Sequence, residues 1–109
     1  MSRVMTAVTV VVALAATAAA QDAKVAKGEK LYADQKCSLC HSIGDKGNKK
    51  GPLDGVATTL KGDEIREWIV DAKGMTAKTK ASRKPEMKAY ALPKEDVDAL
   101  ATYLGTLKK

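Results

Sequence analysis

The chain has 109 residues, which is enough for a single domain, and a formal net charge of +6 at pH 7. Aromatic residues make up only 4% of it and phenylalanine is absent, so large apolar side chains are too few to fill a core without help. Basic and aromatic residues are not interleaved, which argues against a nucleic-acid-binding surface.

Residues 1–20 have the composition of a secretory signal peptide. Arg3 provides a positive charge, residues 8–16 form a largely apolar run, and residues 18–20 are the small alanines that a signal peptidase recognises. The run is shorter than the roughly 20 residues needed to span a bilayer. We therefore expect export to the periplasm, cleavage after Ala20, a mature domain at residues 21–109 and no stable insertion in a membrane.

A first helix is predicted to begin at Asp22 and to run up to Cys37. Its apolar face is marked by residues at spacings of three and four: Val25, Gly28, Leu31 and Tyr32. Glycine lowers helix propensity. Gly28 is therefore either a tolerated small residue or the point at which another helix crosses closely.

The next five residues contain both cysteines and the only histidine of the chain, in the order Cys37-Ser38-Leu39-Cys40-His41. The pattern C-x-x-C-H is typical of covalent attachment of a c-type haem. Each thiol can add to one vinyl group of the porphyrin, and the adjacent imidazole can bind the iron from the same side. Cys37 and Cys40 are therefore predicted to bind one haem c, with His41 as an axial ligand of its iron.

Three other uses of the cysteine pair fit the chain less well. A thioredoxin-like dithiol lies between a strand and a helix, and no such alternation is predicted here. A structural zinc site needs four nitrogen or sulfur ligands, and this cluster offers three. A disulfide between residues three apart would close too small a loop to stabilise the fold much.

Beyond the motif, residues 42–55 are rich in glycine and are predicted to form a loop. A metal-binding histidine usually donates its second ring N–H to a carbonyl or carboxylate, and a Gly51-Pro52 turn folded back on His41 could supply that carbonyl. Helical periodicity then returns in a short turn at residues 56–60, at residues 63–71 and in a final helix that begins at Pro93. No segment alternates as a strand does, so the predicted fold class is all-α.

A second axial ligand has to come from outside the motif. The methionines of the signal peptide would be lost, which leaves Met75, Met87, a lysine or an open position. Met87 lies in a proline-stiffened segment, residues 84–90, that can cross a haem face, whereas Met75 at a helix end suits a core. We therefore predict that His41 and Met87 bind the iron.

Over residues 24–107 the chain resembles the class I cytochromes c, of the small single-haem bacterial type. The matching positions are the haem motif, Gly51-Pro52-Leu53, and Met87 ahead of Ala89-Tyr90. In that family a glycine and an aromatic residue of the first helix cross a leucine and an aromatic residue of the last, at positions that match Gly28, Tyr32, Leu100 and Tyr103. The resemblance implies three to five short helices around one covalently bound haem, and a Pro52 carbonyl that orients His41. Many relatives have proline directly after the methionine ligand, where this chain has Lys88.

The expected function is that of a periplasmic cytochrome that passes one electron between redox proteins and is not an enzyme. The basic residues among positions 73–88, with Lys46 and Lys49, are expected to attract acidic docking patches on those partners. No nucleic acid is expected to bind, and the protein is expected to be a monomer. Two other functions stay open: a haem enzyme or gas sensor with an open axial site, and a haem-free redox or zinc module.

Overall fold

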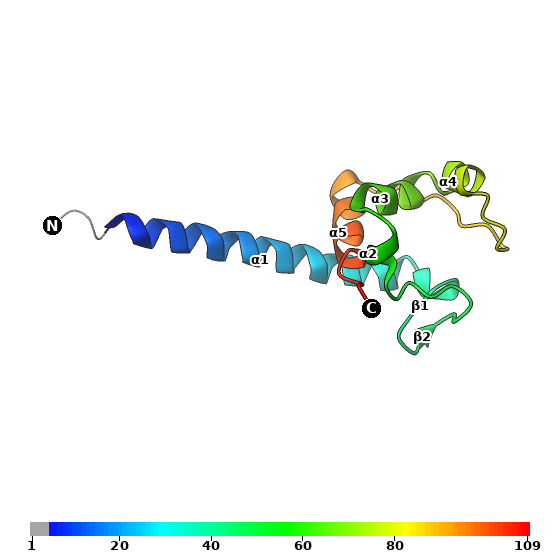
Figure 1. The fold of residues 1–109 in the computed structure, drawn as a ribbon, viewed down its shortest axis with the longest axis horizontal. Coiled ribbons are helices and arrows are strands. Elements are labelled where there is room, and N and C mark those ends of the chain that lie inside the picture. The colour runs from blue at the N-terminus through cyan, green and yellow to red at the C-terminus, as the bar shows by residue number, and fades with distance from the viewer. Residues whose placement is uncertain (1–4) are drawn as a thin grey trace.

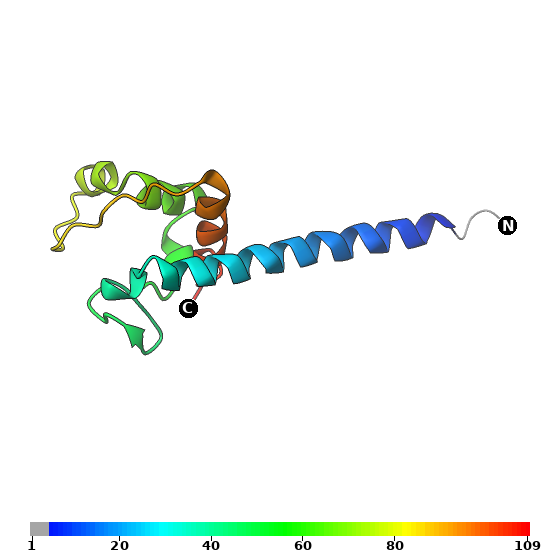
Figure 2. The ribbon, with the colours of Figure 1, turned by 180° about the vertical axis from the view of Figure 1, so that it is seen from behind.

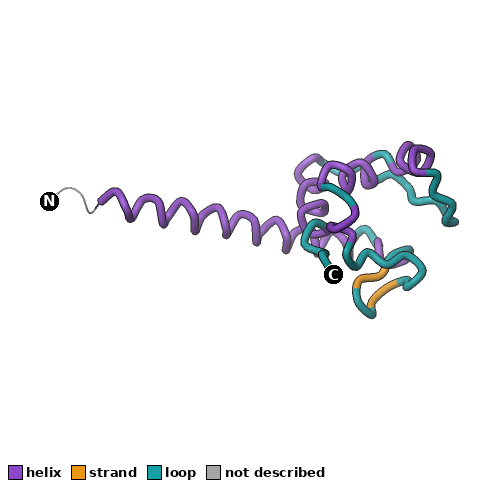
Figure 3. Tube along the Cα trace, viewed as in Figure 1, coloured by secondary structure: helices purple, strands orange, loops and turns teal. Residues whose placement is uncertain are grey.

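The computed structural model describes the backbone of residues 5–109 and the side chains of residues 18–109; residues 1–4 lie outside the described part. Its elements are α1 (Met5–Asp34), the 3-10 turn η2 (Cys37–Leu39), the strands β1 (Ser42–Ile43) and β2 (Lys46–Gly47), and the helices α2 (Val56–Thr59), α3 (Gly62–Val70), α4 (Ala72–Thr79) and α5 (Lys94–Leu104). Helices dominate, and the one sheet of these residues is the short β1–β2 pair (Figure 3). The predicted all-α fold class is therefore confirmed.

The N-terminal part of helix α1 projects away from the rest of the molecule (Figure 1). The predicted first helix, from Asp22 onward, forms its second half and ends at Asp34, while the first half continues back through the predicted signal peptide to Met5. In the part of the chain that the structure describes, we find no helix with the length and apolar character needed to cross a membrane. Cleavage after Ala20 stays a prediction.

Helices α1 and α5 cross at close range, which Figure 2 shows from behind. The crossing needs Gly28, because a Cβ atom there would overlap the Ala99 carbonyl oxygen and lie 2.5 Å from Tyr103 Cβ. Beside it the rings of Tyr32 and Tyr103 pack edge-on, with centroids 6.0 Å apart. Of the two interpretations of Gly28, the close helix crossing is therefore confirmed.

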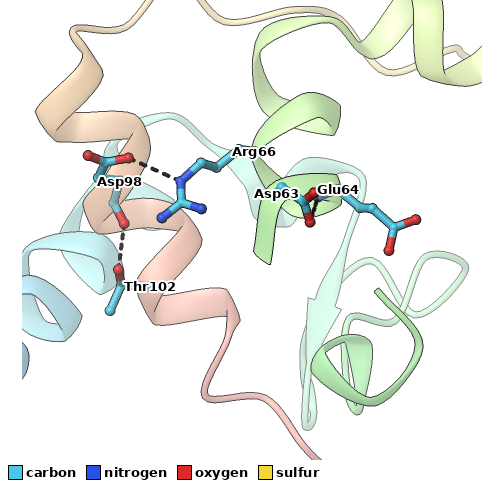
Figure 4. Close-up of polar contacts among 5 residues, drawn as sticks. All are labelled: Asp63, Glu64, Arg66, Asp98 and Thr102. Atoms are coloured by element: carbon cyan, nitrogen blue, oxygen red, sulfur yellow. Dashed lines mark hydrogen bonds and ion pairs between the residues drawn. The ribbon is translucent and has the colours of Figure 1, made fainter. Parts of the chain in front are cut away.

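The buried apolar core lies where α3 packs against α5. Its members recur along one face of each helix: Ile65, Ile69, Val97, Leu100, Ala101 and Leu104. At the edge of this contact Arg66 Nε donates to an Asp98 carboxylate oxygen at 3.1 Å (Figure 4). Because this ion pair is partly solvated, the apolar contact contributes more than the pair to holding α3 on α5.

The sequence analysis did not predict two features of the structure. Helix α4 begins after Asp71, whose side chain accepts a hydrogen bond from the Gly74 N–H at 3.2 Å, and it buries Ala72 and Met75. The strands β1 and β2 form an antiparallel hairpin inside the predicted loop. In Figure 1 the hairpin lies near the turn that follows α1, whereas α4 lies on the other side of the molecule, beyond α3.

Candidate functional site

The motif of residues 37–41 forms one tight turn after α1. Lys36 leaves the helical direction through a left-handed conformation, with φ of 57°. The N–H groups of Cys40 and His41 then both donate to the Cys37 carbonyl, at 3.2 and 3.0 Å. This turn brings both thiols and the imidazole to the wall of one cavity.

The cavity has a volume of about 240 Å³, far more than the roughly 10–15 Å³ that one water molecule requires. Most of its wall is apolar, and all five α-helices contribute to it, together with the loops that connect them. Besides the motif, its lining includes Leu53, Leu60, Trp68, Ile69, Tyr90 and Leu104. A cavity of this size and character suits a bulky, mostly apolar group.

His41 is half-buried, and its Nδ1 atom lies 3.0 Å from the Gly51 carbonyl oxygen. When Nδ1–H donates to this carbonyl, the Nε2 lone pair stays available for a metal ion. Burial lowers the pKa of His41 by more than the hydrogen bond to Gly51 raises it, and nearby Arg83 lowers it further. The site therefore favours the neutral imidazole that metal binding requires.

The Gly51-Pro52 segment does supply the acceptor for His41, but through the Gly51 carbonyl and not through the Pro52 carbonyl that the resemblance implies. Ser42 pairs with the extended chain at Pro52: its N–H donates to the Gly51 carbonyl at 3.1 Å, and its carbonyl accepts from the Leu53 N–H at 2.8 Å. Successive carbonyl groups of an extended chain point to opposite sides. The carbonyl on the His41 side is consequently that of Gly51, while Pro52 restricts the backbone next to it.

Asn48 is a site residue that the sequence analysis missed. Its N–H lies 2.9 Å from the His41 carbonyl and 3.1 Å from the Ser38 carbonyl, and its side-chain amide donates to the Leu39 carbonyl at 3.1 Å. One residue therefore ties the segment directly after β2 to three carbonyls of the motif. Its only signal in the sequence is an asparagine among glycines, which is common to many turns.

The two candidate methionines lie in different environments. The Met87 side chain lines the cavity, together with neighbouring Pro85 and Tyr90. Met75 is 4% exposed, belongs to the buried face of α4 and is not part of the cavity wall. Of the two thioethers, Met87 is thus the one that shares a cavity with His41.

The electrostatics at Cys37 differ from those of a redox-active dithiol. Burial raises the pKa of the Cys37 thiol, and the neighbouring Cys40 adds to the increase. Thioredoxin-like motifs instead lower the pKa of one cysteine, so that it reacts as a thiolate. The two cysteines are also free in the structure. Their setting is that of thiols held at the wall of a binding cavity.

Comparison with known proteins places these residues within one family. The family model described as Cytochrome c matches residues 25–108, a range that contains the motif and the whole cavity wall. Comparisons with curated proteins and with solved structures gave no significant match. The observed chemistry agrees with the family model, because two thiols, an imidazole and a thioether around an apolar cavity are the groups that a covalently bound haem needs.

Proposed function

The chain belongs to the cytochrome c family and binds haem c through Cys37 and Cys40, and on this premise we propose that it is a periplasmic electron carrier whose iron is bound by His41 and Met87. Haem-based electron transfer is the general activity of the family. When bound, the haem iron supplies a centre that accepts and releases one electron. The signal-peptide composition of residues 1–20 supports the periplasmic location.

The observation that carries this proposal is the cavity shared by His41 and Met87. An imidazole nitrogen and a thioether sulfur together would fill both axial positions of the iron. Such a pair raises the reduction potential and leaves no position at which a substrate or gas can bind without displacing a ligand. Because the Gly51 carbonyl already fixes the His41 ring, little rearrangement should accompany the transfer of an electron.

A redox titration of the intact protein, followed by its absorption spectrum, tests this function. We expect a single reversible one-electron transition, with the oxidised spectrum restored after each cycle and no bond made or broken in a substrate. A two-electron transition, or a spectrum that fails to return, would contradict an electron carrier.

The basic surface near the cavity supports a further part of the proposal, docking to an acidic redox partner. Arg83 lines the cavity, and the exposed residues that follow include Lys84 and Lys88. Leu39, which lies between the two cysteines of the cavity wall, is 69% exposed. An exposed apolar side chain and basic residues around one cavity suit a partner that offers both an apolar spot and carboxylates.

If this docking occurs, electron transfer with the partner should slow as ionic strength rises, because salt screens long-range attraction. Lys88→Glu should lower the association rate constant and weaken its salt dependence. Lys24→Glu is the matched control. It makes the same charge change, but at a position of α1 that lies about 12 Å along the helix from Tyr32 in the cavity wall. Equal rates for the two variants, or a rate that does not depend on salt, would argue against the docking surface.

A further inference from the structure

The segment that carries Met87, residues 82–89, borders the cavity without support from its backbone. Hydrogen bonds from the N–H groups of Ala81 and Tyr90 fix its two ends, but in the part of the chain that the structure describes no backbone hydrogen bond involves the residues between them. A segment without backbone hydrogen bonds opens more easily than one that has them. Side-chain contacts therefore decide how firmly Met87 is held at the cavity.

Two of these side-chain contacts are local. Lys84 Nζ lies 3.0 Å from a Glu86 carboxylate oxygen, and Lys88 Nζ lies 5.2 Å from the centre of the Tyr90 ring. Each contact joins residues only two positions apart in the chain. Neither of them ties the segment to another element of the fold.

Arg83 differs, because its guanidinium group reaches Gly51 in the loop that follows His41. A Cβ atom on Gly51 would overlap Arg83 Nη1 and would lie 2.8 Å from Arg83 Cζ. The same Cβ atom would overlap the Cys40 carbonyl oxygen, so the guanidinium and this carbonyl approach one point. In Figures 1 and 2 the loop after α4 and the turn after α1 both lie at the end of the molecule away from the N-terminus. Arg83 thus connects the Met87 segment with the turn that holds His41.

The electrostatics of this contact are attractive. An arginine side chain is positively charged at every physiological pH, and a carbonyl oxygen is the negative end of a dipole. Among the described residues the Cys40 carbonyl accepts no backbone hydrogen bond, whereas the other four carbonyls of residues 37–41 each accept a hydrogen bond. Gly51 has no side chain that would keep the guanidinium away from this carbonyl.

We propose that Arg83 is a positioning residue, whose guanidinium group holds the Met87 segment against Gly51 and the Cys40 carbonyl and so keeps the thioether on the iron. The inference rests on the proposed function, since it requires Met87 to be the second ligand. Without this contact, residues 82–89 would be joined to the rest of the fold mainly at their two ends. The iron would then be open to other ligands for a larger fraction of the time.

The test measures the binding of imidazole to the oxidised, haem-loaded protein, because imidazole can bind the iron only when Met87 leaves it. Arg83→Ala should bind imidazole about two- to fivefold more tightly than the wild type, since an exposed contact of this kind contributes about as much as a surface ion pair. Lys84→Ala is the matched control: it removes the same charge from the same segment, but its contact is local. Wild-type affinity in Arg83→Ala, or an equal increase in both variants, would overturn the inference.

A second variant, Arg83→Lys, separates the contact from the charge alone. Lysine keeps the positive charge but lacks the Nη atoms that lie against Gly51, so we expect tighter imidazole binding here too. Wild-type affinity in Arg83→Lys would show that the charge is sufficient and would overturn the proposed contact. Because Arg83 is exposed, these variants should fold as the wild type does. Failure of the proposed function would look different, since the wild type itself would then lack the thioether-to-iron charge-transfer band.

Discussion

His41 owes its orientation to a single loop, residues 42–52. The Gly51 carbonyl accepts from its ring, while the Asn48 N–H donates to its backbone carbonyl at 2.9 Å. Both contacts are made by the loop's backbone, so they persist through most side-chain changes there. The ring is therefore held in place before a metal is bound, which limits the reorganisation that ligation and electron transfer require.

The assignment of the second ligand is tested by changing each methionine to leucine. Met87→Leu conserves volume but removes the sulfur, so the thioether-to-iron charge-transfer band of the oxidised protein should disappear and the reduction potential should fall. Met75→Leu should keep the band and cost less than about 1.5 kcal/mol of stability, because it is a volume-conserving change in a core. Loss of the band in Met75→Leu, with the band retained in Met87→Leu, would reverse the assignment.

Single residues of the site differ in how far the sequence specifies them. The positions of Cys37, Cys40 and His41 follow from local spacing, because one turn of chain suffices to bring them to one wall. The carbonyl that accepts from His41 does not follow from local spacing. Whether it belongs to Gly51 or to Pro52 depends on the path of the loop, and a shift of one residue would exchange them. The role of Asn48 could not be predicted for the same reason: its three contacts depend on the path of the whole loop.

Among the elements, the crossing of α1 and α5 sets the position of the motif, because the motif directly follows α1. Helices α3 and α5, and the part of α1 from Asp22 onward, could be predicted from their periodicity. Helix α4 could not, because its buried positions are few and alternate with lysines, although Asp71 ahead of it was a usable N-cap signal. The β1–β2 hairpin is too short for any alternation to appear.

The close crossing of α1 and α5 predicts that a larger residue in place of Gly28 destabilises the fold. Gly28→Ala places a methyl group against the backbone of α5, which cannot move aside as a side chain can. We expect a net loss of roughly 1–3 kcal/mol in the free energy of unfolding, despite the better helix propensity of alanine. Denaturant unfolding of the haem-loaded protein measures it.

Gly62→Ala in α3 is the matched control for this substitution. Its nearest neighbour would be Arg66 Nη1 at 3.6 Å, which is an ordinary contact. That variant should be as stable as the wild type or slightly more stable. If Gly28→Ala were equally stable, the helices would not meet as closely as the structure shows.

The molecule as a whole has a small core on one side and a large cavity beside it. The buried core of α3 and α5 consists mostly of aliphatic side chains, and Leu100 and Leu104 belong both to this core and to the cavity wall. A haem in the cavity would therefore extend the core and supply the aromatic volume that the chain lacks. The sequence predicted this shortage from composition alone, but the shape of the cavity depends on contacts between elements far apart in the chain.

The most direct test of the account is to add carbon monoxide to the reduced, haem-loaded protein at neutral pH and to record its absorption spectrum. If His41 and Met87 fill both axial positions, the spectrum should stay unchanged. A rapid and complete change on addition of carbon monoxide would show an open or easily opened iron site, and would contradict an electron carrier in favour of a gas sensor or a haem enzyme.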